Sequence, residues 1–178
     1  MPGRPGAGNP RWGWCRLADG VAVELVATSG VGRDDLVLDL GAGDGALTRP
    51  LAATGAQVVA FELHPERAAA LRRTVGGRVE VVRADVRDLR LPRRPVRVVA
   101  DPPFDGVSSV LDRLTSRGSR LERADLVVPR SVARRWAARL HDGGEWRAVV
   151  AAILPRSAFS PRPRVDCCVL VVERRRGR

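Results

Sequence analysis

The stretch Asp39-Leu40-Gly41-Ala42-Gly43-Asp44-Gly45 decides the fold of this chain, because it joins a predicted strand at 36–40 to a predicted helix at 46–53. Glycines in such a turn let the backbone approach a ligand closely, and the helix N-terminus adds hydrogen-bond donors. The GxGxG spacing differs from the GxGxxG of pyrophosphate-binding folds, so it disfavours a nicotinamide or flavin cofactor. Taken alone, the stretch also fits a plain tight turn without a ligand.

Apolar runs and helical patterns alternate along the rest of the chain, which is typical of a parallel sheet built from βα units. Strands are predicted at 36–40, 57–61, 79–83, 96–100 and 126–129, and further helices at 65–74, 107–116 and 131–140. Two final apolar runs, 149–154 and 165–172, predict an antiparallel pair at the edge of the sheet. We therefore expect an α/β, Rossmann-like domain over residues 21–178, with helices on both faces, after a segment at 1–20 that contains Gly, Pro and Trp.

The charge of the chain points to a polyanionic partner. All 31 Lys or Arg positions are arginine, and 20 acidic residues leave a formal net charge of +11. Coding bias explains arginine in place of lysine, but it does not explain the positive excess, so nucleic acid is the expected partner. No apolar run is long enough to span a membrane, and residues 1–10 lack the apolar core of a secretory signal. We expect a cytoplasmic protein with no membrane partner.

The cysteines and histidines do not form a recognisable metal motif. The three cysteines include the adjacent pair Cys167 and Cys168, in which a disulfide would be strained, so reduced structural thiols are expected. His64 and His141 stand far from one another in the sequence, and no Cys/His spacing suits zinc. No metal is predicted.

Carboxylates follow the next two predicted strands and suggest a cofactor. Glu62 lies 21 residues beyond Gly41, where a doubly wound fold places an acid that accepts both ribose hydroxyls. Asp85 ends the third strand, where it can accept a hydrogen bond from an adenine amino group, although Asp88 competes for this role. S-adenosylmethionine carries no phosphate, and its zwitterionic tail suits a glycine-lined turn beside an acid. The predicted cofactor residues are Asp39, Gly41, Gly43, Glu62, Leu63, Asp85, Val86 and Asp101.

The most informative motif is Asp101-Pro102-Pro103-Phe104, directly after the strand at 96–100. It offers a side-chain acceptor in Asp101, a backbone carbonyl on the stiff residue Pro102, and an aromatic face in Phe104. An exocyclic amine conjugated with a base ring is a poor nucleophile, and two acceptors on its hydrogens would free the lone pair. Phe104 would stack on a base that has left its helix. A strand-terminating turn with a core Phe is the alternative.

The ordered set Asp39 to Gly45, Glu62, Asp85 and Asp101 to Phe104 resembles the ribosomal RNA adenine methyltransferases of the Erm and KsgA type. The resemblance extends to residues 159–166, FSPRPRVD, which resemble the F-x-P-x-P-x-V-D signature before the last strand of that family. It implies a class I methyltransferase fold and transfer of one or two methyl groups from S-adenosylmethionine to adenine N6 in 23S rRNA. It also implies resistance to macrolide-, lincosamide- and streptogramin-type antibiotics.

Two departures from that family matter. The family's usual motif is N-[IL]-P-[YF], whereas this chain has Asp101 and Pro102, the form common in amino-methylating DNA and guanine enzymes. The N-terminal G-Q-[NH]-F-L is replaced by GWCRL at 13–17. The WGW stretch at 12–14 resembles the short Erm-like proteins of mycobacteria and related actinobacteria, which lack the C-terminal helical domain, so we expect none here.

Without that domain, RNA capture is expected to fall to arginines and to the N-terminal segment of a monomer. The predicted RNA-binding residues are Trp14, Arg16, Arg130, Arg134, Arg162 and Arg164. Naked 23S rRNA and a ribosomal precursor particle both fit as partners, and mono- and dimethylation both fit the residues. A methyltransferase for amino groups of DNA or of another RNA is an alternative, as is a non-catalytic RNA-binding or assembly protein. A small-molecule or protein methyltransferase would not need the +11 charge.

Overall fold

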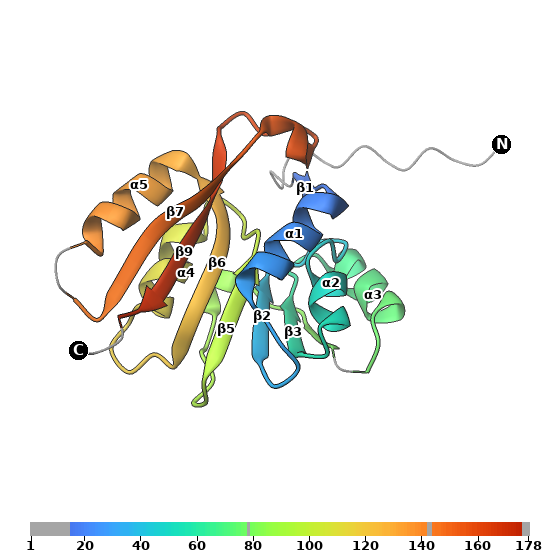
Figure 1. The fold of residues 1–178 in the computed structure, drawn as a ribbon. Coiled ribbons are helices and arrows are strands. Elements are labelled where there is room, and N and C mark those ends of the chain that lie inside the picture. Colours follow the sequence, from blue (N-terminus) through green and yellow to red (C-terminus); the bar gives the residue numbers. More distant parts are fainter. Residues whose placement is uncertain (1–14, 78, 142–143, 176–178) are drawn as a thin grey trace.

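The computed structural model describes residues 15–77, 79–141 and 144–175. Its centre is a seven-stranded sheet in the order β4-β3-β2-β5-β6-β9-β7 (Figure 1). The strands are β2 (Leu36–Leu40), β3 (Gln57–Phe61), β4 (Val79–Val82), β5 (Val96–Ala100), β6 (Leu121–Pro129), β7 (Trp146–Leu154) and β9 (Cys167–Arg174). Strands β2 to β6 pair in parallel, whereas β9 runs antiparallel to both β6 and β7. The mostly parallel sheet with an antiparallel edge is therefore confirmed.

The inner strands are apolar because helices cover both faces of the sheet. All five residues of β2 are buried, and its side chains alternate between two cores. Leu36, Leu38 and Leu40 pack with α4 (Val107–Leu114) and α5 (Arg130–Arg139) on one face. Val37 packs on the other face, which is covered by α1 (Asp19–Ser29), α2 (Thr48–Ala53) and α3 (Pro65–Thr74) (Figure 1).

Local signals explain two of these helices. Helix α3 has Pro65 in its first turn, where no backbone N–H is needed, and Glu66 beside it complements the positive end of the helix dipole. In α4 the four apolar residues Val107, Val110, Leu111 and Leu114 are all fully buried. The amphipathic pattern read from the sequence is thus confirmed for α4.

A second, two-stranded sheet ties the start of the described chain to the connection between β7 and β9. In this sheet, β1 (Arg16–Leu17) pairs antiparallel with β8 (Phe159–Ser160). Short 3₁₀ turns η2 (Val86–Asp88) and η3 (Arg156–Ala158) complete the described elements. Since β7 ends and β9 begins beside the end of β6, this connection lies at the carboxyl edge of the parallel strands.

Several predicted boundaries were wrong. Helix α1 was not expected, and it contains the predicted boundary at residue 20. Strand β6 begins at Leu121, five residues earlier than predicted. The prediction missed this start because Glu122 and Arg123 interrupt the apolar pattern of the strand. Smaller shifts affect the starts of α2 and β7, the ends of β4 and α4, and both ends of α5 and β9, whereas β7 ends at Leu154 as predicted. Within the described ranges, no helix is long and apolar enough to cross a membrane.

Candidate functional site

A cavity of about 100 Å³ opens at the carboxyl ends of β2, β3, β4 and β5. The strand order reverses here, because β3 lies on one side of β2 and β5 on the other. Open α/β sheets bind their ligands at such a point. The cavity is lined by Cys15, Gly41, Glu62, Leu63, Arg67, Ala84, Asp85, Val86, Asp101, Pro102, Pro103, Phe104 and Phe159. Most of the residues predicted for the cofactor and the base therefore lie around one cavity, whereas Asp39 and Gly43 do not line it directly.

The glycine turn is packed against the Asp101–Phe104 turn. Gly41 has φ 86°, a conformation that L side chains rarely adopt. A Cβ atom at Gly41 would lie 3.0 Å from Cδ of Pro103 and 3.4 Å from the carbonyl oxygen of Asp101. The absence of a side chain thus lets the two motifs meet at the cavity wall.

Glu62 is buried at the end of β3, with 4% of the residue exposed. Its Oε2 accepts a hydrogen bond of 2.8 Å from the backbone N–H of Gly43, and its Oε1 accepts one of 2.7 Å from that of His64. The guanidinium of Arg67 lies 3.4 Å from Oε1. Each carboxylate oxygen has two lone pairs, so Glu62 keeps acceptor capacity beside the cavity.

Asp39 lies beneath the glycine turn and is 1% exposed. The hydroxyl of Thr48 donates to its Oδ2 at 2.6 Å, while Oδ1 has no hydrogen-bond partner among the described residues. Burial, together with the charge of Glu62, raises the pKa of Asp39 to about 7, although the Thr48 hydrogen bond opposes this rise. An unpartnered buried oxygen of this kind suits a cationic or N–H donor group from a ligand.

Asp85 caps η2 and lines the cavity, whereas Asp88 ends the same turn and does not line it. The backbone N–H of Arg87 donates to Oδ1 of Asp85 at 2.8 Å, and the Arg87 guanidinium bonds both carboxylate oxygens. These hydrogen bonds lower the pKa of Asp85. Asp85 is therefore an ionised acceptor that a ligand must share with Arg87.

Asp101 is half-buried and is the first residue of the proline turn, directly after the end of β5. Burial and the nearby Asp39 raise the pKa of Asp101 to about 8. Pro102 has no backbone N–H, so it presents only a carbonyl to its surroundings. Half-buried Phe104 completes the wall of the cavity. An acceptor, a stiff carbonyl and an aromatic ring thus stand beside the glycine turn.

This geometry coincides with a family match. The family described as ribosomal RNA adenine dimethylase matches residues 18–178. The chain belongs to this family. It is 37% identical over 147 residues to the mycinamicin-resistance protein MyrB of Micromonospora griseorubida. This match covers 78% of this chain and 47% of MyrB. The chain thus spans about half the length of that relative.

Two other proteins are similar to this chain over more of their own length. Ribosomal RNA small subunit methyltransferase A of Rubrobacter xylanophilus is 34% identical, over 99% of this chain and 72% of that protein. The crystal structure of the 23S rRNA methyltransferase ErmE superposes with a TM-score of 0.77 and 26% identity, over 88% of this chain and 68% of ErmE. The resemblance predicted from the motifs is therefore confirmed at the level of the family.

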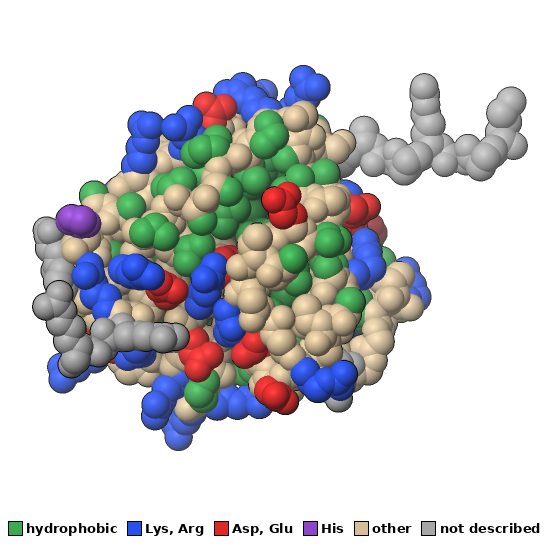
Figure 2. Space-filling view, in the orientation of Figure 1, with side chains coloured by type: hydrophobic (Ala, Val, Ile, Leu, Met, Phe, Trp, Pro, Cys, Tyr) green, Lys and Arg blue, Asp and Glu red, His purple; other side chains and the backbone are tan. Residues whose placement is uncertain are grey.

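The residues predicted to bind RNA fall into two groups. Arg134, Arg162 and Arg164 are exposed and form no ion pair within the described part of the chain, and Arg130 begins α5 at the same edge of the sheet as the cavity. Figure 2 shows basic side chains along this upper rim, over α5 and the connection between β7 and β9. Trp14 lies outside the described residues.

Arg16 differs from the other predicted RNA-binding residues. Its guanidinium donates to the carboxylate of Asp44 in the glycine turn and to that of Asp19, each at 2.5 Å. Two carboxylates thus neutralise Arg16, and the ion pair with Asp44 links β1 to the glycine turn. The structure therefore places Arg16 in contact with the glycine turn, and its contact with RNA stays a prediction.

Several residues around the cavity were not among the site residues predicted from the sequence. Cys15 and Phe159 reach it because β1 and β8 pair, which no local pattern indicates. Arg67 reaches it from the first turn of α3, and Thr48 reaches Asp39 from α2. Only Phe159 carried a usable signal, since it opens the FSPRPRVD signature.

The cysteines are free thiols in the structure, as predicted. Burial, and the nearby carboxyl of Asp101, raise the pKa of Cys15 and raise that of Cys167 to about 12. Both thiols are therefore poor nucleophiles near neutral pH. No cluster of three His, Cys, Asp or Glu side chains suited to a metal occurs in the described ranges.

Proposed function

We propose that this protein transfers methyl groups from S-adenosylmethionine to the N6 amino group of an adenine in 23S rRNA. The observation that carries the proposal is the position of Asp101, Pro102 and Phe104 at the cavity that Glu62 and Asp85 also line. Acceptors for a ribose, an adenine amine and a substrate amine thus surround one space. Family membership and the similarity to ErmE support the choice of reaction and of RNA.

The residues around the cavity fit the cofactor. Glu62 would accept the ribose hydroxyls, because backbone N–H groups hold both of its oxygens in place. Asp85 would accept from the adenine amine, and the buried oxygen of Asp39 would face the amino-acid end, where no protein donor now satisfies it. Gly41 has no side chain, so the proline turn can pack against the glycine turn at the cavity wall. When bound, S-adenosylmethionine supplies an electrophilic methyl group.

The chain's own residues would activate the target amine without removing its proton first. The carboxyl of Asp101 and the carbonyl of Pro102 would accept the two amine hydrogens, which favours tetrahedral nitrogen and frees its lone pair. With a pKa near 8, Asp101 is largely protonated at pH 7 in the free protein, but its carbonyl oxygen remains an acceptor. Phe104 would stack on the extruded base.

The arginines at the same edge would hold the RNA through its phosphates. Arg130, Arg134, Arg162 and Arg164 lie near the connection between β7 and β9 or on α5, beside the end of β6. Guanidinium groups match phosphate oxygens in a bidentate geometry. We infer that the protein works as a monomer in the cytoplasm, where its rRNA substrate is found, and confers resistance to macrolide-type antibiotics.

The test is methylation of purified RNA and ribosomal subunits with labelled S-adenosylmethionine, followed by mapping of the modified base. We expect label in adenine of 23S rRNA or of the large subunit. Label confined to small-subunit rRNA would instead favour a second candidate function, methylation of adenine in small-subunit rRNA. The match to ribosomal RNA small subunit methyltransferase A over 99% of the chain supports this second candidate. Label in DNA, or in guanine, would follow the DPPF variant of the motif rather than the family. Absence of label with retained RNA binding would indicate a non-catalytic RNA-binding protein.

A further inference from the structure

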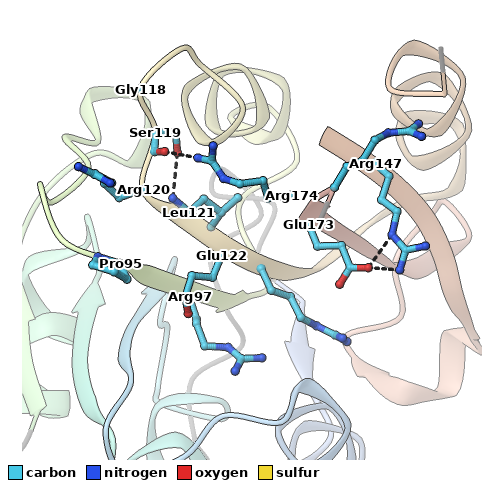
Figure 3. A pocket seen from close by; sticks show the side chains of 12 residues that line it. Pro95, Arg97, Gly118, Ser119, Arg120, Leu121, Glu122, Arg147, Glu173 and Arg174 are labelled. Carbon is cyan, nitrogen blue, oxygen red and sulfur yellow. Dashed lines mark hydrogen bonds and ion pairs between the residues drawn. The ribbon is translucent and has the colours of Figure 1, made fainter. Parts of the chain in front are cut away.

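Two depressions lie at the edge of the sheet opposite the candidate site, where β5 and β6 begin. The larger is a cleft of about 1540 Å³ that extends to the end of β9 (Figure 3). The smaller is a groove of about 440 Å³ between the 89–93 segment and the turn that joins α4 to β6. Both include Gly118, Ser119 and Arg120, so they form one continuous surface.

Six arginines line the large cleft, and carboxylates pair with four of them. Arg147 pairs with Glu173, as Figure 3 shows, and Arg174 pairs with Glu145. The other two paired arginines and their partners are Arg97 with Asp35 and Arg123 with Asp125. Because carboxylates already satisfy these guanidinium groups, the cleft has little charge left for an anionic ligand.

The small groove has the opposite character. Its five charged lining residues are Arg90, Arg93, Arg113, Arg117 and Arg120, and no carboxylate is among its described lining. All five are exposed; Arg113 donates to the carbonyl of Leu89, and the other four have no partner among the described residues. We call this set the arginine groove. Like charges held together along a concave surface repel one another and raise the local concentration of anions.

The lining of the arginine groove favours a phosphate backbone over a protein partner. Its apolar lining is limited to buried Leu89 and half-buried Leu91 and Pro92, and it contains none of the aromatic residues that dominate protein interfaces. The fork of the guanidinium group suits phosphate oxygens, and unpaired arginines lose no carboxylate partner on binding. Basic side chains also gather at this lower edge in Figure 2.

We propose that the arginine groove binds the phosphate backbone of a second segment of the same RNA whose adenine enters the cavity. The proposal rests on the proposed function and specifies its substrate class. Strand β5, five residues long, separates the two surfaces by about 15 Å at the usual rise per residue, and the sheet lies between them. A short hairpin seated at the cavity offers a single RNA segment, whereas a large folded rRNA can present a second segment at the opposite edge of the sheet. We therefore expect the substrate to be a large folded rRNA that reaches both edges.

The test compares two pairs of substitutions that remove the same charge from the full chain. The groove pair is Arg93→Gln with Arg117→Gln, and the control pair is Arg33→Gln with Arg73→Gln, whose residues are exposed and line neither depression. Binding to a full-length 23S rRNA transcript, and to a single short hairpin cut from it, is measured over a range of salt concentrations. Thermal unfolding of both variants confirms that they are folded.

We expect the groove pair to weaken binding to the transcript about tenfold at physiological salt, and to lower the log–log salt slope by about two. Binding to the hairpin, and the behaviour of the control pair on both RNAs, should stay within about twofold of the parent. Equal losses on hairpin and transcript, or equal losses in both pairs, would overturn the proposal, because both reflect general charge. Unchanged binding by the groove pair also overturns it and leaves an acidic protein as the partner. Since the readout is binding, a groove effect without any methylation would support the groove while rejecting the proposed function.

Discussion

The backbone N–H of Gly43 donates a 2.8 Å hydrogen bond to Oε2 of Glu62, which links the glycine turn after β2 to the end of β3. A second backbone donor, His64, holds the other carboxylate oxygen. The acid is 4% exposed, so these two bonds also offset the cost of its burial. Glu62 therefore has two roles, one in the packing of the turn and one in the proposed capture of a ribose.

Glu62→Ala should weaken S-adenosylmethionine binding by about 1–3 kcal/mol, because a buried pair of hydrogen bonds to ribose is lost. The free energy of unfolding should also fall by about 1–3 kcal/mol, since the N–H groups of Gly43 and His64 lose their acceptor. Calorimetry and urea denaturation measure the two effects. Glu24→Ala, an exposed change on α1, is the control. Unchanged cofactor affinity in folded Glu62→Ala protein removes Glu62 from the site.

The sheet could be predicted from the sequence because its strands are short apolar runs that end in polar turn residues. Strands β2, β3 and β5 have the predicted bounds. Helix α1 was missed because its sequence, DGVAVELVATS, places apolar residues on nearly every side and shows little 3.6-residue periodicity. The pairing of β1 with β8 joins two-residue strands that lie far apart in the chain, and no local pattern encodes such a contact.

The candidate site was predictable where its residues follow strands. Glu62, Asp85 and Asp101 were found because the ends of parallel strands meet at one edge, so order along the chain gives position in space. Thr48 comes from a helix, and its bond to Asp39 depends on how α2 packs. Arg16 was expected to face RNA, but the sequence could not show that Asp44, 28 residues away, would hold it.

Thr48→Val should destabilise the protein by about 1–3 kcal/mol, because it removes the hydroxyl that donates to Asp39 Oδ2 at 2.6 Å in the buried core. The loss should be greater above pH 7 than at pH 5, since the hydrogen bond favours the ionised form of a carboxyl whose pKa is about 7. Urea denaturation at both pH values measures this. The control is Thr54→Val, whose hydroxyl donates to the Leu51 carbonyl rather than to an acid. An equal loss at both pH values would show that Asp39 does not titrate as described.

Arg16→Ala and Arg162→Ala should affect different properties of the protein. Arg16 bonds Asp44 and Asp19, so its loss should lower the melting temperature and weaken cofactor binding while leaving the salt dependence of RNA binding unchanged. Arg162 is exposed and forms no ion pair in the described part of the chain, so its loss should spare stability and lower the log–log salt slope by about one. Thermal unfolding and RNA binding at several salt concentrations give both readouts. A changed slope in Arg16→Ala would restore its expected contact with RNA.

The raised pKa of Asp101 predicts a pH-dependent stability. A carboxyl with a folded-state pKa of about 8 and an ordinary unfolded value near 4 binds its proton more tightly when folded. It contributes stability that is complete below about pH 4 and is lost as pH rises through about 8. The melting temperature should therefore fall between pH 6 and pH 9 by more in the parent than in Asp101→Asn, which cannot ionise. Asp105→Asn, an exposed neighbour, should behave like the parent. Parallel curves for parent and Asp101→Asn would contradict the raised pKa.

The last prediction separates amine gripping from general-base catalysis at Asp101. Asp101→Ala should lower single-turnover methylation by on the order of a hundredfold or more, with cofactor affinity nearly intact, because a preorganised acceptor is lost. Asp101→Asn should be much milder, since the amide keeps a carbonyl acceptor, whereas an obligatory base would lose its function on this change. Phe104→Leu should also lower turnover by more than its small change in volume suggests, because stacking on the base is lost. The measurement is single-turnover methylation of the mapped RNA by all three variants. Equal, near-complete loss in Asp101→Asn and Asp101→Ala would reject the gripping mechanism and make the carboxylate a base.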